Sequence, residues 1–250
     1  MRRARTITVL VLLLAGAPVV GRAESFSISS AQLLYGGPFD DRVYGYNTAT
    51  GGMATLSFEH YGTWGYGDNY MIVDVLFGPF VDAKGAPLGQ NVQLYGEWGP
   101  RVALGRVLGL EEGLGFLKEV FVATQLNVSG TGFWGVLGGM GVDFNLPFGL
   151  VAGVNVYYRK DRFTPNAVQV SPYWELPLRI RWVGLLLRGY VDIVGSPAGF
   201  DVNSQPQLLM DLGGVLGERG RKIQLGVEWY FHHSPILTVH APQLLLRWVW

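Results

Sequence analysis

Large apolar side chains recur at every second position along most of this 250-residue chain, from Phe26 to the terminal Trp250. A period of two puts the apolar side chains on one face of an extended strand and the remaining side chains on the other. After position 23, no unbroken apolar run reaches the roughly 20 residues that a membrane-spanning helix needs. The sequence therefore predicts an all-β protein whose strands have two unlike faces.

Composition decides what the apolar faces contact. Hydrophobic residues make up 49% of the chain and charged residues only 15%, whereas a soluble domain has about 25% charged residues. A soluble β-sandwich or lipocalin also alternates, but its water-facing side would carry dense charge. A closed sheet in a membrane pairs every backbone group and spreads its apolar residues over alternate positions. We therefore expect a transmembrane antiparallel up-and-down β-barrel.

The barrel is expected to have about twelve strands, separated by clusters of Gly, Pro, Asn and Asp. The predicted strands are 26–36, 51–61, 69–78, 91–105, 116–127, 132–145, 150–160, 170–182, 184–194, 207–216, 222–232 and 242–250. Longer polar connections are predicted at 37–50, 79–90, 161–169, 195–206 and 233–241. The connections between them are tight, except 106–115, which has room for a helical turn. Long loops outside and short turns in the periplasm are typical of such barrels.

The amino end has the features of an export signal. Arg2, Arg3 and Arg5 precede an apolar run over 7–20, and small residues lead up to Ala23. We expect a signal peptide over 1–23 and the barrel over 24–250. Without this leader the chain has 15 basic and 19 acidic residues, and the acidic excess argues against a nucleic-acid partner. Cysteine is absent, so neither a disulfide nor a thiolate metal site is possible.

The last residues form a two-faced strand that ends on an aromatic side chain. Leu244, Leu246, Trp248 and Trp250 share one side, and the polar Arg247 lies on the other. Such an ending resembles the assembly signal of bacterial outer-membrane barrels. The resemblance implies the outer membrane of a Gram-negative bacterium as the location, with membrane lipid and the barrel assembly machinery as partners.

The strand predicted at 170–182 sets the direction of the two faces. Its odd-numbered positions include Arg179 and Arg181, whereas Trp174 and Trp182 occupy even-numbered positions. An arginine on the lipid side costs about 2 to 4 kcal/mol at the bilayer midplane. We therefore expect the tryptophan side to face lipid and both arginines to face the lumen.

Several segments together indicate a family. They are 55–61 (TLSFEHY), 64–70 (WGYGDNY), 73–75 (VDV), 97–101 (EWGPR), 141–147 (GVDFNLP), 153–158 (GVNVYY) and 229–233 (WYFHH). In this order they resemble the Tsx-like nucleoside-specific channels of the outer membrane. Short external loops and Ser234-Pro235 after the last histidine depart from the family pattern. The resemblance implies a narrow twelve-stranded barrel that passes nucleosides by facilitated diffusion.

Nucleosides are uncharged, have flat bases and carry ribose hydroxyls, so their path needs aromatic platforms interleaved with polar groups. Stacking on a ring is worth about 1 to 3 kcal/mol per base, and several weak sites in series permit exit. The predicted rings are Tyr61, Tyr95, Phe121, Tyr157, Tyr190 and Tyr230. The predicted polar contacts are Glu59, Asp74, Glu97, Arg101, Arg179 and Arg181. Equally, charged groups inside a small barrel can simply pair with one another.

Two other functions stay open. Lipid-modifying outer-membrane barrels, such as phospholipases and lipid A deacylases, use a Ser-His constellation, and in this chain Ser234 follows His233. A structural or adhesive barrel would transport nothing. Since no carboxylate has a readable spacing to His232 and His233, we expect neither catalysis nor a metal site, and no cofactor is implied.

Overall fold

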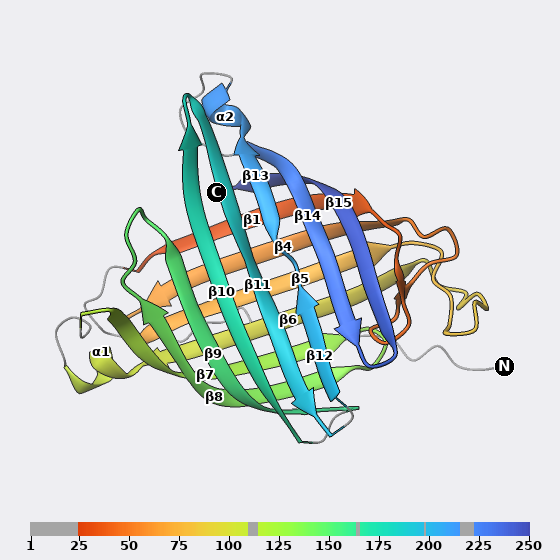
Figure 1. The fold of residues 1–250 in the computed structure, drawn as a ribbon, viewed down its shortest axis with the longest axis horizontal. Helices are drawn as coiled ribbons and strands as arrows, with labels where there is room; N and C mark the ends of the chain where they lie inside the picture. The colour runs from red at the N-terminus through yellow and green to blue at the C-terminus, as the bar shows by residue number, and fades with distance from the viewer. Residues whose placement is uncertain (1–24, 110–114, 164–165, 198, 216–222) are drawn as a thin grey trace.

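In the computed structural model the chain forms a closed antiparallel barrel (Figure 1). The structure describes residues 25–109, 115–163, 166–197, 199–215 and 223–250. Strand β1 (Ser27–Gly36) pairs with β15 (Leu237–Val249), and β10 (Ala167–Ile180) pairs with β11 (Val183–Ser196). These pairings leave the main sheet without a free edge. The predicted signal peptide, 1–23, lies outside the described residues.

The wall has twelve strand positions in the described part of the chain, as predicted. The other strands are β4 (Met53–Trp64), β5 (Gly67–Phe77), β6 (Val92–Ala103), β7 (Leu117–Ser129), β8 (Trp134–Phe144), β9 (Val151–Asp161), β12 (Gly199–Ser204), β13 (Gln207–Asp211) and β14 (Ile223–Ser234). Strands β12 and β13 share one position, because both lie between β11 and β14. Pro206 stands at the break between them, where its missing N–H cannot join the ladder.

Two predicted loops are wrong. Residues 199–204, expected in a connection, form β12, and β15 begins at Leu237 instead of at 242. The polar residues that suggested a loop belong to strands, because Asn203 and Ser204 are buried side chains of β12. Polar residues occur both on the inner face of a water-filled barrel and in loops, so the sequence pattern alone could not distinguish a strand from a loop here.

The two ends of the barrel differ. Loop 37–52, which contains the short strands β2 (Asp40–Asp41) and β3 (Tyr46–Asn47), and loop 78–91 lie at one end. Longer loops are typical of the extracellular end. The connections at the opposite end include α1 (Leu104–Leu108) and α2 (Leu212–Val215). In the described residues, neither helix is long and apolar enough to cross a membrane.

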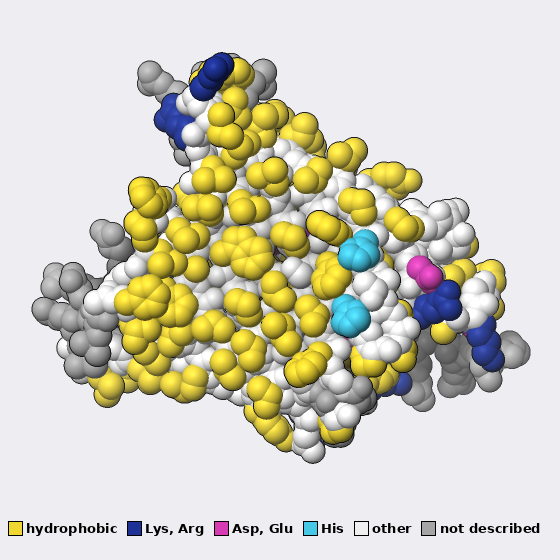
Figure 2. Space-filling model, in the orientation of Figure 1, with side chains coloured by type: hydrophobic (Ala, Val, Ile, Leu, Met, Phe, Trp, Pro, Cys, Tyr) yellow, Lys and Arg dark blue, Asp and Glu magenta, His cyan; other side chains and the backbone are white. Residues whose placement is uncertain are grey.

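The outer wall is apolar, and Figure 2 shows hydrophobic side chains over most of the visible face. Strand β14 illustrates the alternation, because Val227 and Trp229 are 47% and 52% exposed whereas Glu228 and Tyr230 are 6% and 2% exposed. Strand β15 repeats it, with Leu244 67% exposed beside Leu245 at 1%. The predicted faces are confirmed on both strands, and this outer surface is suited to hydrocarbon.

Candidate functional site in the lumen

A cavity of about 1230 Å³ runs inside the barrel. Its lining includes Lys118 and Arg179 toward the end that carries α1 and α2, and Phe39 and Tyr46 from loop 37–52 at the other. The wall positions alternate, so every strand that lines the cavity sends every second side chain into it. The lumen is therefore the place to look for a solute site.

Ten of the twelve predicted site residues line this cavity. They are Glu59, Tyr61, Asp74, Tyr95, Glu97, Arg101, Tyr157, Arg179, Tyr190 and Tyr230. Phe121 faces inward, but the Arg101 guanidinium carbon covers its ring at 4.0 Å from the centroid, and the side chain is only 2% exposed. Phe121 therefore packs against the Arg101 guanidinium and does not line the cavity.

Arg181 lies outside the wall, and its predicted lumen position is wrong. Strand β10 ends at Ile180 and β11 begins at Val183, so Arg181 is part of the turn between them, with φ 55°. This left-handed conformation, which non-glycine residues seldom adopt, takes the side chain out of the strand alternation. Arg179 keeps its place on the wall, and its Nε donates a hydrogen bond to the Arg181 carbonyl at 3.3 Å.

Arg101 on β6 is at the centre of a network of hydrogen bonds and ion pairs in the lumen. Its Nε and Nη2 donate to the two carboxylate oxygens of Asp68 at 2.8 and 2.6 Å. Nη1 donates to Asp143 Oδ1 at 3.0 Å and to the Tyr173 hydroxyl at 2.7 Å. Tyr173 in turn donates to Asp143. The planar guanidinium thus ties β5, β6, β8 and β10 together, and its donors are occupied by the wall.

Glu59 on β4 forms a second charged centre. Its carboxylate accepts hydrogen bonds from Arg188 at 2.8 Å, from Arg247 at 3.4 Å and from the Ser30 hydroxyl at 3.2 Å. Arg159 is bound in the same way, since its Nε donates to Asp161 at 2.7 Å. The positive charges of Arg188, Arg247 and Arg159 are thus paired with carboxylates of the wall itself.

Four lumen carboxylates have only neutral partners among the described residues. Glu97 accepts hydrogen bonds from the Tyr95 hydroxyl and from Gln125. Asp192 accepts one from Ser171 at 2.6 Å, and Glu228 accepts two from glutamine amides. The fourth, Asp74, has an oxygen with no partner. Within the described lining, nine carboxylates face the cavity and only five Lys or Arg side chains do, so the passage is acidic.

Tyrosine rings differ in how far they reach the cavity. Tyr157 and Tyr230 are 3% and 2% exposed, whereas Tyr61, Tyr95 and Tyr190 are half-buried and present part of the ring. Two further half-buried rings were missed by the sequence analysis and line the same cavity, namely Tyr70 and Tyr173. Their even and odd positions match those of Asp74 and Arg179 on the same strands, so the alternation contained the signal.

Loop 37–52 folds into the mouth of the barrel and is held there by polar contacts. Asp41 Oδ2 accepts the Tyr230 hydroxyl at 2.5 Å and lies 2.6 Å from His232 Nδ1. His232 Nε2 lies 3.0 Å from Asp201 Oδ2. Tyr44 stacks on the His232 ring at 4.1 Å and donates to Asp201 at 2.6 Å. Burial and, secondly, the Asp201 charge raise the pKa of the Tyr44 hydroxyl, which therefore stays a donor.

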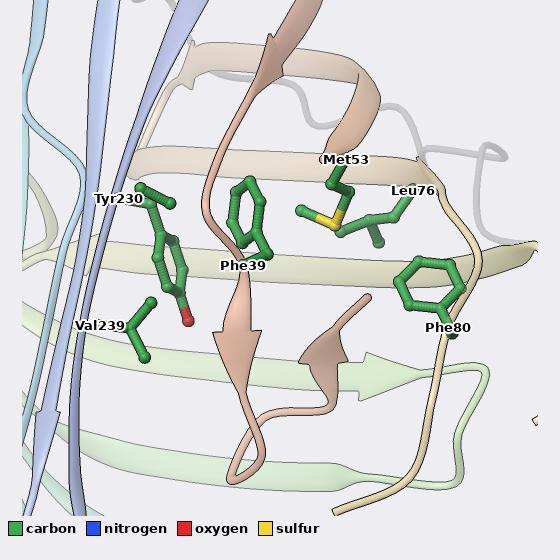
Figure 3. Packing of buried hydrophobic residues seen from close by; sticks show 7 residues of the cluster. Phe39, Met53, Leu76, Phe80, Tyr230 and Val239 are labelled. Atoms are coloured by element: carbon green, nitrogen blue, oxygen red, sulfur yellow. The ribbon is translucent and has the colours of Figure 1, made fainter. Parts of the chain in front are cut away.

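Apolar contacts secure the same loop. Phe39 packs between Tyr230 on one side and Met53 on the other (Figure 3). The cluster also contains Leu76, Phe80, Val239 and Ala241. The Phe39 and Tyr230 ring centroids are 5.5 Å apart. The sequence analysis placed this segment in an external loop, and nothing in its Gly, Pro and Asp content indicates that it turns inward.

The Ser-His pair considered for catalysis is not assembled. His233 Nδ1 lies 2.8 Å from Thr238 Oγ1, and the buried Ser234 hydroxyl has no hydrogen-bond partner among the described residues. Among the residues that the structure describes, no group of three or more His, Asp or Glu side chains is placed to hold a metal ion.

No family model matches the chain, and no curated protein sequence matches it either. Solved structures do match. A KdgM porin in complex with disordered oligogalacturonate superposes with a TM-score of 0.50 at 8% identity, over 89% of this chain and 98% of that one. A second KdgM porin structure gives the same TM-score and coverage at 7% identity. The fold is that of an outer-membrane porin barrel.

This likeness concerns the fold, and it agrees with the apolar outer wall. Together they place the protein in the bacterial outer membrane as a multi-pass β-barrel. Both structures named here are KdgM porins, so the resemblance to the Tsx-like channels stays a prediction.

Proposed function

We propose that the protein is an outer-membrane channel for the facilitated diffusion of small solutes, with nucleosides as the preferred class. The observation that carries the proposal is the lining of the cavity, in which half-buried tyrosine rings alternate with hydrogen-bonding carboxylates and amides. A flat base with a polyhydroxyl sugar matches both kinds of surface.

Each half-buried ring offers a modest stacking site. Tyr61, Tyr95 and Tyr190 come from three different strands of the wall, β4, β6 and β11. Stacking of a base on one ring contributes about 1 to 3 kcal/mol, while carboxylate oxygens such as those of Glu97 accept hydrogen bonds from ribose hydroxyls. Sites of this strength hold a nucleoside briefly and release it to the next, which permits flux.

Acidic sugars are a less suitable class. One structural neighbour is described in complex with oligogalacturonate, but this chain shares only its fold. Arg101, Arg188 and Arg247 already bind wall carboxylates, and carboxylates outnumber basic groups in the described lining. A polyanion entering this passage would meet like charge.

Planar-bilayer recording tests the proposal. Added adenosine should reduce the single-channel current reversibly. Tyr95→Leu removes the ring, so we expect block to need about tenfold more adenosine, in line with the loss of one stacking contact. Tyr95→Phe keeps the ring and should retain most of the block. Tyr158→Leu is the matched control, because Tyr158 is 58% exposed on the lipid side of β9.

Normal conductance steps that adenosine does not alter would remove nucleosides as the solute. Release of fatty acid from lipid vesicles that is abolished by Ser234→Ala would instead favour the lipid-modifying enzyme.

A further inference from the structure

Five polar side chains form what we call the acceptor belt of the lumen: Ser57, Asp74, Gln207, Glu228 and Gln243. Ser57 on β4 stands directly opposite Asp74 on β5. Gln207 on β13 and Gln243 on β15 flank Glu228 on β14 as its cross-strand partners. All five side chains line the cavity.

The glutamine amide groups of the belt donate to Glu228, but their own oxygens accept nothing from the described residues. Gln207 Nε2 donates to Glu228 Oε2 at 2.7 Å, and Gln243 Nε2 donates to Glu228 Oε1 at 2.9 Å. The amide oxygens of both glutamines are buried and have no partner among the described residues. These side chains are themselves deeply buried, since Gln207 is 6% and Gln243 is 4% exposed.

The part of the belt on β4 and β5, which only β1 separates from β15, also has unpaired oxygens. Ser57 is 4% exposed, and neither its hydroxyl oxygen nor Asp74 Oδ1 has a hydrogen-bond partner in the described part of the chain. Buried acceptors that find no donor are costly, and they are uncommon in folded proteins. Asp74 Oδ1 and the two glutamine oxygens can only accept, so these three indicate that a ligand supplies the missing donors.

Charge narrows the ligand further. Asp74 and Glu228 form no ion pair with Lys or Arg among the residues described, whereas Glu59 nearby is bound to both Arg188 and Arg247. A group that fits two carboxylates without a counter-charge and several unpaired acceptors must donate hydrogen bonds, carry positive charge and need no donor in return. A primary ammonium meets these conditions, because it has three N–H donors and no acceptor.

We propose that the acceptor belt binds the ammonium group of small organic cations and that the barrel conducts such solutes. Tyr95, the cross-strand partner of Asp74, and Tyr70 add ring faces that attract a cation. The inference rests on the proposed channel, but it does not depend on nucleoside selectivity.

Three probes with the same four-carbon chain test the proposal in planar bilayers: 1,4-diaminobutane, 1,4-butanediol and succinate. We expect the diamine to block and to permeate, with a reversal potential that favours the cation, while the diol and succinate leave the current unchanged. Asp74→Asn and Glu228→Gln each keep the shape of the side chain and remove its charge. Each should raise the diamine concentration needed for half block by about tenfold, the effect of weakening one charge-assisted hydrogen bond.

Glu175→Gln is the matched control. It removes the same charge from the same cavity, but Glu175 is 48% exposed and lies outside the belt, so half block should stay near the wild-type value. Equal block by diamine and diol would overturn the proposal, as would diamine block that neither Asp74→Asn nor Glu228→Gln weakens. Conductance steps report that each variant has folded and inserted. Adenosine block, recorded on the same membranes, can fail without affecting the diamine result, so the two proposals are separable.

Discussion

Removing the Arg101 side chain should destabilise the barrel strongly, because two carboxylates depend on it. Arg101 is 8% exposed and contacts Asp68 at 2.6 Å and Asp143 at 3.0 Å. Arg101→Met keeps the length of the side chain but leaves both carboxylates buried without a counter-charge. Breaking a buried ion pair in this way costs about 3 to 5 kcal/mol.

A compensating variant separates the charge effect from simple loss of packing. In Arg101→Met/Asp68→Asn/Asp143→Asn the stranded charges are gone, and replacing a complete buried ion network with neutral groups is often close to neutral. We therefore expect this triple variant to recover most of the lost stability. Arg42→Met serves as the exposed control, because Arg42 pairs with Asp40 at the surface, and such pairs contribute little.

The assay is guanidinium unfolding of the vesicle-reconstituted barrel, followed by the fluorescence of its eight tryptophans. The unfolding midpoint should fall for the single variant and return for the triple variant, with an unchanged slope. A single variant as stable as the wild type, or a triple variant no better than the single one, would refute the view that Arg101 neutralises the wall.

Two further predictions concern the mouth and the outer wall. Asp41→Ala removes the contacts that hold loop 37–52 to Tyr230 and His232, so single-channel conductance should rise. Asp40→Ala, at a position whose side chain is 61% exposed, should leave the conductance unchanged. Equal conductance in both variants would mean that Tyr44 and the Phe39 cluster hold the loop without Asp41. Leu244→Arg, near the middle of β15 and 67% exposed, should lower the free energy of unfolding in vesicles by about 2 to 4 kcal/mol. Ile236→Arg, in the turn before β15 and 81% exposed, should have little effect, and a similar loss for both would argue against lipid around Leu244.

The wall of the barrel could be predicted because the membrane makes alternation nearly obligatory. Over 223–229 on β14 and 244–248 on β15 every second residue is apolar and exposed, and the lumen residues Glu228, Tyr230 and Arg247 follow from the opposite parity. Where the alternation ends, prediction failed. Arg181, like Arg179, occupies an odd-numbered position, but a positive φ places it in a turn. The two turn residues, Arg181 and Trp182, include no glycine or asparagine that would have indicated the turn.

Contacts between segments that are far apart in the sequence could not be predicted, for a different reason. Residue types show that Glu59, Arg188 and Arg247 are charged, but only the closed barrel brings β4, β11 and β15 close enough for the three to meet. The inward course of loop 37–52 likewise depends on Asp41 finding His232, which lies 191 positions away in the chain. Period-two patterns describe single strands and contain no information about such meetings.

The mouth and the wall are built from separate parts. Loop 37–52 narrows the entrance through its own side chains, while barrel closure depends on the pairing of β1 with β15 and of β10 with β11. The size selection of solutes and the stability of the barrel can therefore be altered independently. Loop 37–52 is thus a suitable segment to change when the protein is engineered as a nanopore of chosen diameter.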